Sequence, residues 1–91
     1  MVRRQRRTGI LDDRARLILR ALVAERRGRV LDAIGYLEKA LEVRPWDALA
    51  HYNLGRLFYL MKQPELGRPQ FENYLKLAPT APDAPQIRAF L

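Results

Sequence analysis

The segments that decide the fold are Val30–Pro45, VLDAIGYLEKALEVRP, and Pro64–Pro79, PELGRPQFENYLKLAP. The second segment begins 34 residues after the first, and both end with a proline. Within each segment, apolar residues recur every three or four positions, which is the spacing of one face of a helix. The proline ends the helix, because the residue before a proline avoids helical backbone torsion angles. The sequence therefore predicts two similar helices.

The two segments also match position by position. At the 34-residue offset, large apolar, small and proline positions coincide, although few residues are identical. The matching pairs are Leu37 and Phe71, Leu41 and Leu75, Ala33 and Gly67, and Pro45 and Pro79. A period of this length indicates a repeated helix–turn–helix unit.

Three further helices are expected around these two. The first begins at about Thr8 or Asp12 and ends at Arg27, and Gly28 is well placed to end it in a left-handed conformation. The next covers about residues 48–61, with Asp47 as the N-cap. A short last helix begins after Asp83, which is expected to cap it. The fold class predicted from the sequence is an all-α helix–turn–helix repeat solenoid of about five helices.

Two residues of the second copy are expected to disturb its geometry. Pro69 lies inside the helix predicted for residues 64–77, where it removes one backbone hydrogen bond and favours a kink. Tyr74 stands where the first copy has the small Ala40. The helix that follows is therefore expected to pack farther away or at a different angle.

The spacing of small, aromatic and proline residues resembles the tetratricopeptide repeat family. In the second copy the residues that carry the resemblance are Leu54, Gly55, Phe58, Gly67, Phe71 and Pro79. In the first copy they are Gly28, Ala33, Leu37, Ala40 and Pro45, whereas Arg20 and Ala21 replace the usual Leu-Gly pair. Small residues are needed where two antiparallel helices cross, because a larger side chain would push them apart.

The resemblance divides the chain into a basic N-terminal arm and one helical-repeat domain. The arm covers residues 1–8 and the domain covers residues 9–91. Repeat one is expected at about 14–47, repeat two at about 48–81, and a capping helix at about 83–91. Such units bury their apolar faces by stacking on one another.

The resemblance implies a protein–protein interaction module in which the first helix of each pair lines a concave groove. By repeat position, the partner-binding residues of the second copy are Leu49, Tyr52, Asn53, Arg56 and Tyr59. Asn53 is expected to bond a partner's backbone through its amide, and Arg56 to hold a carboxylate. These expectations favour an acidic peptide or protein partner. The alternative is that these are ordinary solvated helix residues.

The corresponding face of the first copy is apolar and includes Ile18, Leu19 and Leu22. An exposed apolar patch usually marks an interface. We therefore expect these three residues to mediate a weak homodimer, and a self-assembling subunit is the alternative function. The alternative is a shifted register, in which this face is buried against the second helix.

Charge adds a further hypothesis. The net charge is +7, and residues 1–29 hold ten Arg but only three acidic residues. This segment favours binding to nucleic acid or to an anionic surface. No aromatic residue is interleaved with these arginines, and a solubilising tail has the same composition, so a protein or peptide partner remains the favoured one.

The sequence contains no motif for catalysis, a cofactor or a metal. There is no Cys and no Ser, and His51 is expected to be a packed structural residue. Trp46, in the turn after Pro45, is expected either to pack toward His51 or to contact a partner. We therefore expect no enzyme activity.

No segment predicts export or a membrane span. The longest strictly apolar run is Leu57–Met61, far below the roughly 20 residues of a membrane-spanning helix. The basic N-terminus is not followed by an apolar stretch and a small-residue cleavage site. A cytoplasmic protein is expected.

Overall fold

The computed structural model describes residues 12–91, and this part of the chain is all-helical. The basic arm predicted for residues 1–8 lies outside the described residues. The five helices are α1 (Asp13–Arg26), α2 (Val30–Val43), α3 (Ala48–Leu60), α4 (Pro64–Leu77) and α5 (Ala84–Arg88). The fold class predicted from the sequence is confirmed, and α2 and α4 lie within the two segments Val30–Pro45 and Pro64–Pro79, each ending two residues before the proline.

Aspartate caps begin the first helix of each pair. The Asp12 carboxylate accepts a hydrogen bond from the backbone N–H of Ala15 at 2.7 Å, and the Asp47 carboxylate accepts one from Ala50 at 2.9 Å. Each bond satisfies one of the amides that have no partner inside the helix. The cap predicted at Asp47 is confirmed, and Asp12 caps α1 in the same way.

The turns between paired helices share one hydrogen-bonding pattern. Gly28 ends α1 with a φ of +78°, and Lys62, 34 residues later, follows α3 with a φ of +62°. In each turn the N–H of this residue donates to a carbonyl three residues back, and the next N–H donates to one five residues back. Both turns therefore close the helix end in the same left-handed form.

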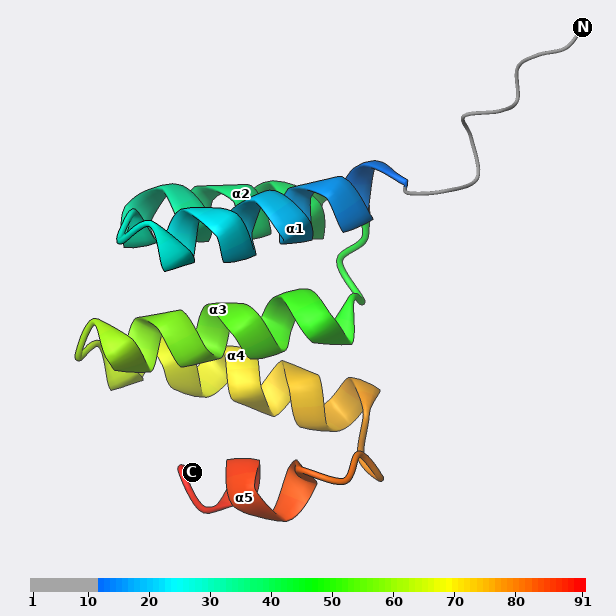
Figure 1. Cartoon of the computed structure of the whole chain (residues 1–91). Helices are drawn as coiled ribbons and strands as arrows, with labels where there is room; N and C mark the ends of the chain where they lie inside the picture. The colour runs from blue at the N-terminus through cyan, green and yellow to red at the C-terminus, as the bar shows by residue number, and fades with distance from the viewer. Residues whose placement is uncertain (1–11) are drawn as a thin grey trace, which may run out of the picture.

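The chain forms two helical hairpins, which we call the first hairpin (α1–α2) and the second hairpin (α3–α4). In Figure 1 they stack one above the other, with α1 and α3 in one layer and α2 and α4 in the other. Helix α2 packs against α3 and so joins the hairpins. The core is aliphatic, and its least exposed members are Ala21, Ala33, Leu37, Ala40, Ala50 and Leu57.

The second hairpin is closely packed where its helices cross. A Cβ atom added to Gly67 would lie 2.7 Å from the Tyr59 ring and 3.0 Å from the Gly55 carbonyl oxygen. A Cβ atom on Gly55 would lie 2.6 Å from the ring of Phe71. These distances leave no room for a side chain, which confirms the expected reason for small residues at the crossing.

Helix α5 lies beyond the second hairpin and packs on α4. Asp83 stands at its N-cap position, but its side chain makes no capping hydrogen bond. This part of the prediction is wrong, because the Asp83 carboxylate instead accepts a 2.6 Å hydrogen bond from the Tyr74 hydroxyl. That bond is the main cause that raises the pKa of Tyr74 to about 12. The bulky Tyr74 thus holds the chain that leads into α5.

We expected Pro69 to disturb α4. The helix nevertheless continues through Pro69, from Pro64 to Leu77. Across residues 12–91, every helix is too short or too polar to cross a membrane.

Candidate functional site

All five residues predicted to bind a partner lie on α3, which stands beside α1 in the same layer (Figure 1). Their environments differ. Leu49 is 50% exposed, Tyr52, Arg56 and Tyr59 are half-buried, and Asn53 is buried at 5% exposed. The α1–α3 layer therefore presents apolar and aromatic groups at both ends of α3, with polar side chains between them.

Arg56 is engaged by a residue of the first hairpin. Its two terminal nitrogens donate to the two carboxylate oxygens of Glu25, each at 2.6 Å. The hydrogen bonds from Arg56 are the main cause that holds the pKa of the Glu25 carboxyl below its ordinary value of 4.5. The place expected for a partner's carboxylate is thus occupied by Glu25, and the sequence-based role of Arg56 is not supported by its geometry.

Asn53 is also satisfied within the chain. Its side-chain N–H donates to the Leu49 carbonyl at 3.0 Å, and its side-chain oxygen accepts a 3.0 Å hydrogen bond from Arg56. A buried amide that is already bonded at both ends gains little by turning toward a partner's backbone. Asn53 supports Arg56 and α3, which differs from the expected contact with a partner.

An apolar hollow of about 480 Å³ lies between α3 and α5. The Tyr59 ring stacks on Phe71, with centroids 5.2 Å apart, and Phe90 lies 5.1 Å from Tyr59. Leu60, which is 60% exposed, stands in its wall, and Glu25 and Arg56 close one side. Tyr52 and Tyr59 thus belong to an aromatic pocket that can hold an apolar side chain.

A second hollow, of about 280 Å³, lies between α1 and α3. It brings the predicted self-association residues together with Leu49, which the sequence assigned to partner binding. Leu19 is 51% exposed and Leu22 is 36% exposed, but Ile18 is only 4% exposed. The expectation that Ile18 stands in solvent is wrong, because it belongs to the core between the hairpins.

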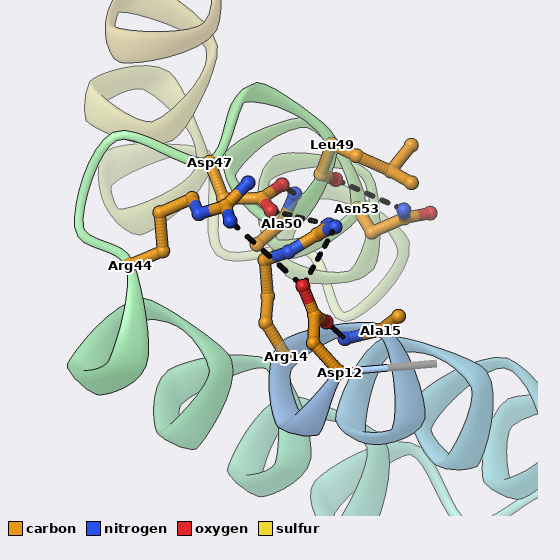
Figure 2. A network of polar contacts seen from close by, with 8 residues as sticks. All are labelled: Asp12, Arg14, Ala15, Arg44, Asp47, Leu49, Ala50 and Asn53. Carbon is orange, nitrogen blue, oxygen red and sulfur yellow. Dashed lines mark hydrogen bonds and ion pairs between the residues drawn. The ribbon is translucent and has the colours of Figure 1, made fainter. Parts of the chain in front are cut away.

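A partly buried ion pair holds the ends of α1 and α3 together beside this second hollow. An Arg14 terminal nitrogen lies 2.6 Å from Asp47, which is 5% exposed and also caps α3. Figure 2 shows Arg14 between Asp47 and Asp12, with Arg44 approaching Asp12 from the other side at 3.8 Å. The Arg14–Asp47 and Glu25–Arg56 pairs therefore link α1 to α3 at two separate points.

His51 is buried at 8% exposed, as expected of a structural residue. Its Nε2 donates to the Pro45 carbonyl at 2.8 Å, and its Nδ1 lies 2.8 Å from the Gln70 side-chain amide. Trp46 is 65% exposed, so most of its ring faces solvent rather than packing toward His51.

Sequence reasoning missed Glu25 as a functional neighbour of α3. One signal was available, since Glu25 is the only acidic residue between Asp13 and Asp32 in an arginine-rich stretch. Its repeat-equivalent position in the second copy is Tyr59. The comparison of repeats alone therefore hid its pairing with Arg56.

No protein-family model matches the chain. No curated protein matches it significantly.

Proposed function

We propose that this chain is a non-catalytic, tetratricopeptide-like module that binds a segment of a partner protein along the face formed by α1, α3 and α5. The observation that carries the proposal is the pair of apolar hollows on this face, one at each end of α3. The 34-residue match of turns and small residues supports the family resemblance.

The geometry favours an apolar partner segment over an acidic one. Arg56 and Arg14 are both paired with carboxylates of the chain itself, so neither offers an unpaired charge on this face. Leu49 and Leu60 mark the two hollows and are 11 positions apart on α3, a rise of about 16 Å. An extended peptide spans this distance in about five residues. A partner with two large apolar residues at that spacing fits best.

Selection from a random dodecamer peptide library tests this proposal. We expect enriched peptides to carry two apolar residues about five positions apart, and we expect Leu49→Asp and Leu60→Asp each to weaken their binding at least tenfold. Both leucines are at least half exposed, so these variants retain the core.

Leu31→Asp is the matched control, because Leu31 is 72% exposed on α2 and lines neither hollow. Its binding should equal that of the wild type. Equal losses in all three variants, or enriched peptides that bind each variant normally, would rule out this face.

Self-association is a second candidate, favoured by the exposed Leu19, Leu22 and Leu49 around one hollow. A second copy that covers this hollow would remove all three side chains from water. Light scattering over a hundredfold concentration range tests it: the mass should rise above 10.6 kDa, and Leu19→Asp should restore that mass. A constant mass in the wild type contradicts a dimer.

A further inference from the structure

The other end of the first hairpin carries a groove lined by arginines. The groove has a volume of about 330 Å³. Arg20 reaches it from α1, Arg27 and Arg29 from the turn between α1 and α2, and Tyr36 from α2. Three arginines from different parts of the hairpin therefore line one hollow.

These arginines differ from Arg14 and Arg56 in having no acidic partner. Within residues 12–91, Arg20, Arg27 and Arg29 form no ion pair. Residues 1–11 contain no Asp or Glu that could supply one. Asp32 is the one acidic residue in the groove wall and leaves the three arginines with a net positive charge. Guanidinium groups that are not neutralised within the chain attract an anionic ligand.

The groove also offers an aromatic surface. Tyr36 is half-buried and packs against the core, which fixes its position, and Leu19 and Val23 continue the apolar wall. The sequence shows no aromatic residue among the arginines of residues 1–29. Folding supplies one, because α2 returns alongside α1 and brings Tyr36 to the groove.

We propose that this groove binds single-stranded nucleic acid, with phosphates on Arg20, Arg27 and Arg29 and a base against Tyr36. A charged groove combined with an aromatic platform is the arrangement that holds a single strand without reading its sequence. The site is independent of the proposed peptide-binding face, with which it shares only Leu19 in the second hollow.

The choice of arginine supports a phosphate ligand. All ten basic residues among residues 1–29 are Arg and none is Lys. Arginine binds phosphate oxygens through two parallel hydrogen bonds and also stacks on bases. Arg16 lies one turn before Arg20 on α1 but pairs with the exposed Asp13 at 3.7 Å, so the unpaired positive charge at the groove is that of Arg20, Arg27 and Arg29.

The test is fluorescence anisotropy with a labelled oligouridylate of about twelve nucleotides, titrated at several salt concentrations. We expect Arg20→Gln/Arg27→Gln/Arg29→Gln to weaken binding at least tenfold. The slope of log affinity against log salt should flatten by about 2, since each phosphate contact on a single strand contributes about 0.7.

The matched control is Lys39→Gln/Lys62→Gln/Lys76→Gln, which removes the same charge from exposed side chains outside the groove. It should weaken binding clearly less than the arginine variant does. Equal losses would show a diffuse attraction and overturn the site. So would binding of anionic phosphatidylserine vesicles or poly-glutamate, but not of the oligonucleotide, through the same arginines.

Variants of Tyr36 distinguish the contribution of base stacking to binding from that of charge. Tyr36→Phe keeps the ring and should bind within about twofold of the wild type, whereas Tyr36→Leu should lose fivefold or more with an unchanged salt slope. Equal affinities of these two variants would remove Tyr36 from the site. Thermal denaturation of both checks that the core beneath Tyr36 is intact.

Discussion

The two hairpins share a backbone but fill their helix crossings differently. The first hairpin has Ala21 and Ala33 at the positions of Gly55 and Gly67, and all four residues are buried. Opposite them, the first hairpin carries Leu37 where the second carries Phe71. The first hairpin thus fills its crossing with two methyl groups and a leucine side chain. The second hairpin has no side chain at the two glycine positions and fills the space with an aromatic ring.

The glycine in the first turn and the glycine at the second crossing serve different purposes. Gly28 has a positive φ but open space around its Cα, whereas Gly55 has no room for a Cβ. Glycine is therefore used for backbone torsion in one place and for volume in the other. Lys62 has the torsion of Gly28 without being glycine. The two copies therefore place the same packing and torsion constraints at equivalent positions, but they satisfy these constraints with different residues.

The largest expected loss of stability comes from removing an aspartate cap, and it should differ between α1 and α3. Asp47→Ala should lower the free energy of unfolding by about 3 kcal/mol, because it removes a cap and leaves the partly buried Arg14 with only the more distant Asp12, at 3.7 Å. The exposed Asp12→Ala should cost clearly less. Urea denaturation measures both.

Asp47→Asn serves as the control for this comparison, because asparagine caps a helix about as well as aspartate but carries no charge. Its loss should lie between those of Asp12→Ala and Asp47→Ala. If Asp47→Asn is as stable as the wild type, the pair with Arg14 contributes nothing.

The next effect exchanges the two ways of filling a crossing. Gly55→Ala should cost about 2 kcal/mol, since its Cβ would lie 2.6 Å from the Phe71 ring, which is only 2% exposed and packed by neighbouring rings. Gly55→Ala/Phe71→Leu recreates the Ala21–Leu37 combination of the first hairpin. The double variant should be at least 1 kcal/mol more stable than the sum of the single losses predicts. Strictly additive losses, measured by chemical denaturation, would contradict the proposed exchange.

A smaller effect concerns the Glu25–Arg56 pair between the hairpins. Because the folded protein holds the pKa of Glu25 below 4.5, the pair stabilises the protein above that pH. The contribution should disappear as the pH falls below 4.5 through the folded pKa. At neutral pH Glu25→Gln should cost about 1 kcal/mol, since both side chains are partly exposed.

Thermal denaturation of the wild type and Glu25→Gln between about pH 3 and pH 7 measures this effect. The melting temperatures of the two proteins should converge toward the acid end of this pH range. A constant difference over the whole range would show that the charge of Glu25 is irrelevant.

The fold was accessible from the sequence because its constraints are local. Pro45, Pro79 and Gly28 act on the backbone within one or two residues, so they place the helix ends without knowledge of the packing. The two aspartate caps of α1 and α3 act over three residues in the same way. Asp83 is the exception, because a tyrosine nine residues earlier competes for its carboxylate.

The candidate sites were less accessible because they depend on how helices face one another. Ile18 and Leu19 are neighbours in the chain, yet one is buried and the other is half exposed, according to the angle at which α1 meets its neighbours. Arg56 finds Glu25 31 residues away across the stacked hairpins. Tyr36 reaches the arginines through the fold of the hairpin. The periodicity of apolar residues shows which side chains share one face of a helix, but not which residues of other helices pack against that face.

The smallest expected effect tests the two turns directly. Lys62 has a φ of +62°, and a side chain in that region costs about 1 kcal/mol relative to glycine. Lys62→Gly removes that cost but also gives the unfolded chain more freedom, so a net gain of about 0.5 kcal/mol is expected. The melting temperature should rise by about 2–4 °C, since 1 kcal/mol corresponds to about 4–8 °C in a domain of this size. Gly28→Ala is the reciprocal variant and should lower it, although nothing lies within 4 Å of the added Cβ, because only the torsion opposes the side chain. A Lys62→Gly protein that melts below the wild type would show that the lysine side chain stabilises the second turn in a way the first turn lacks.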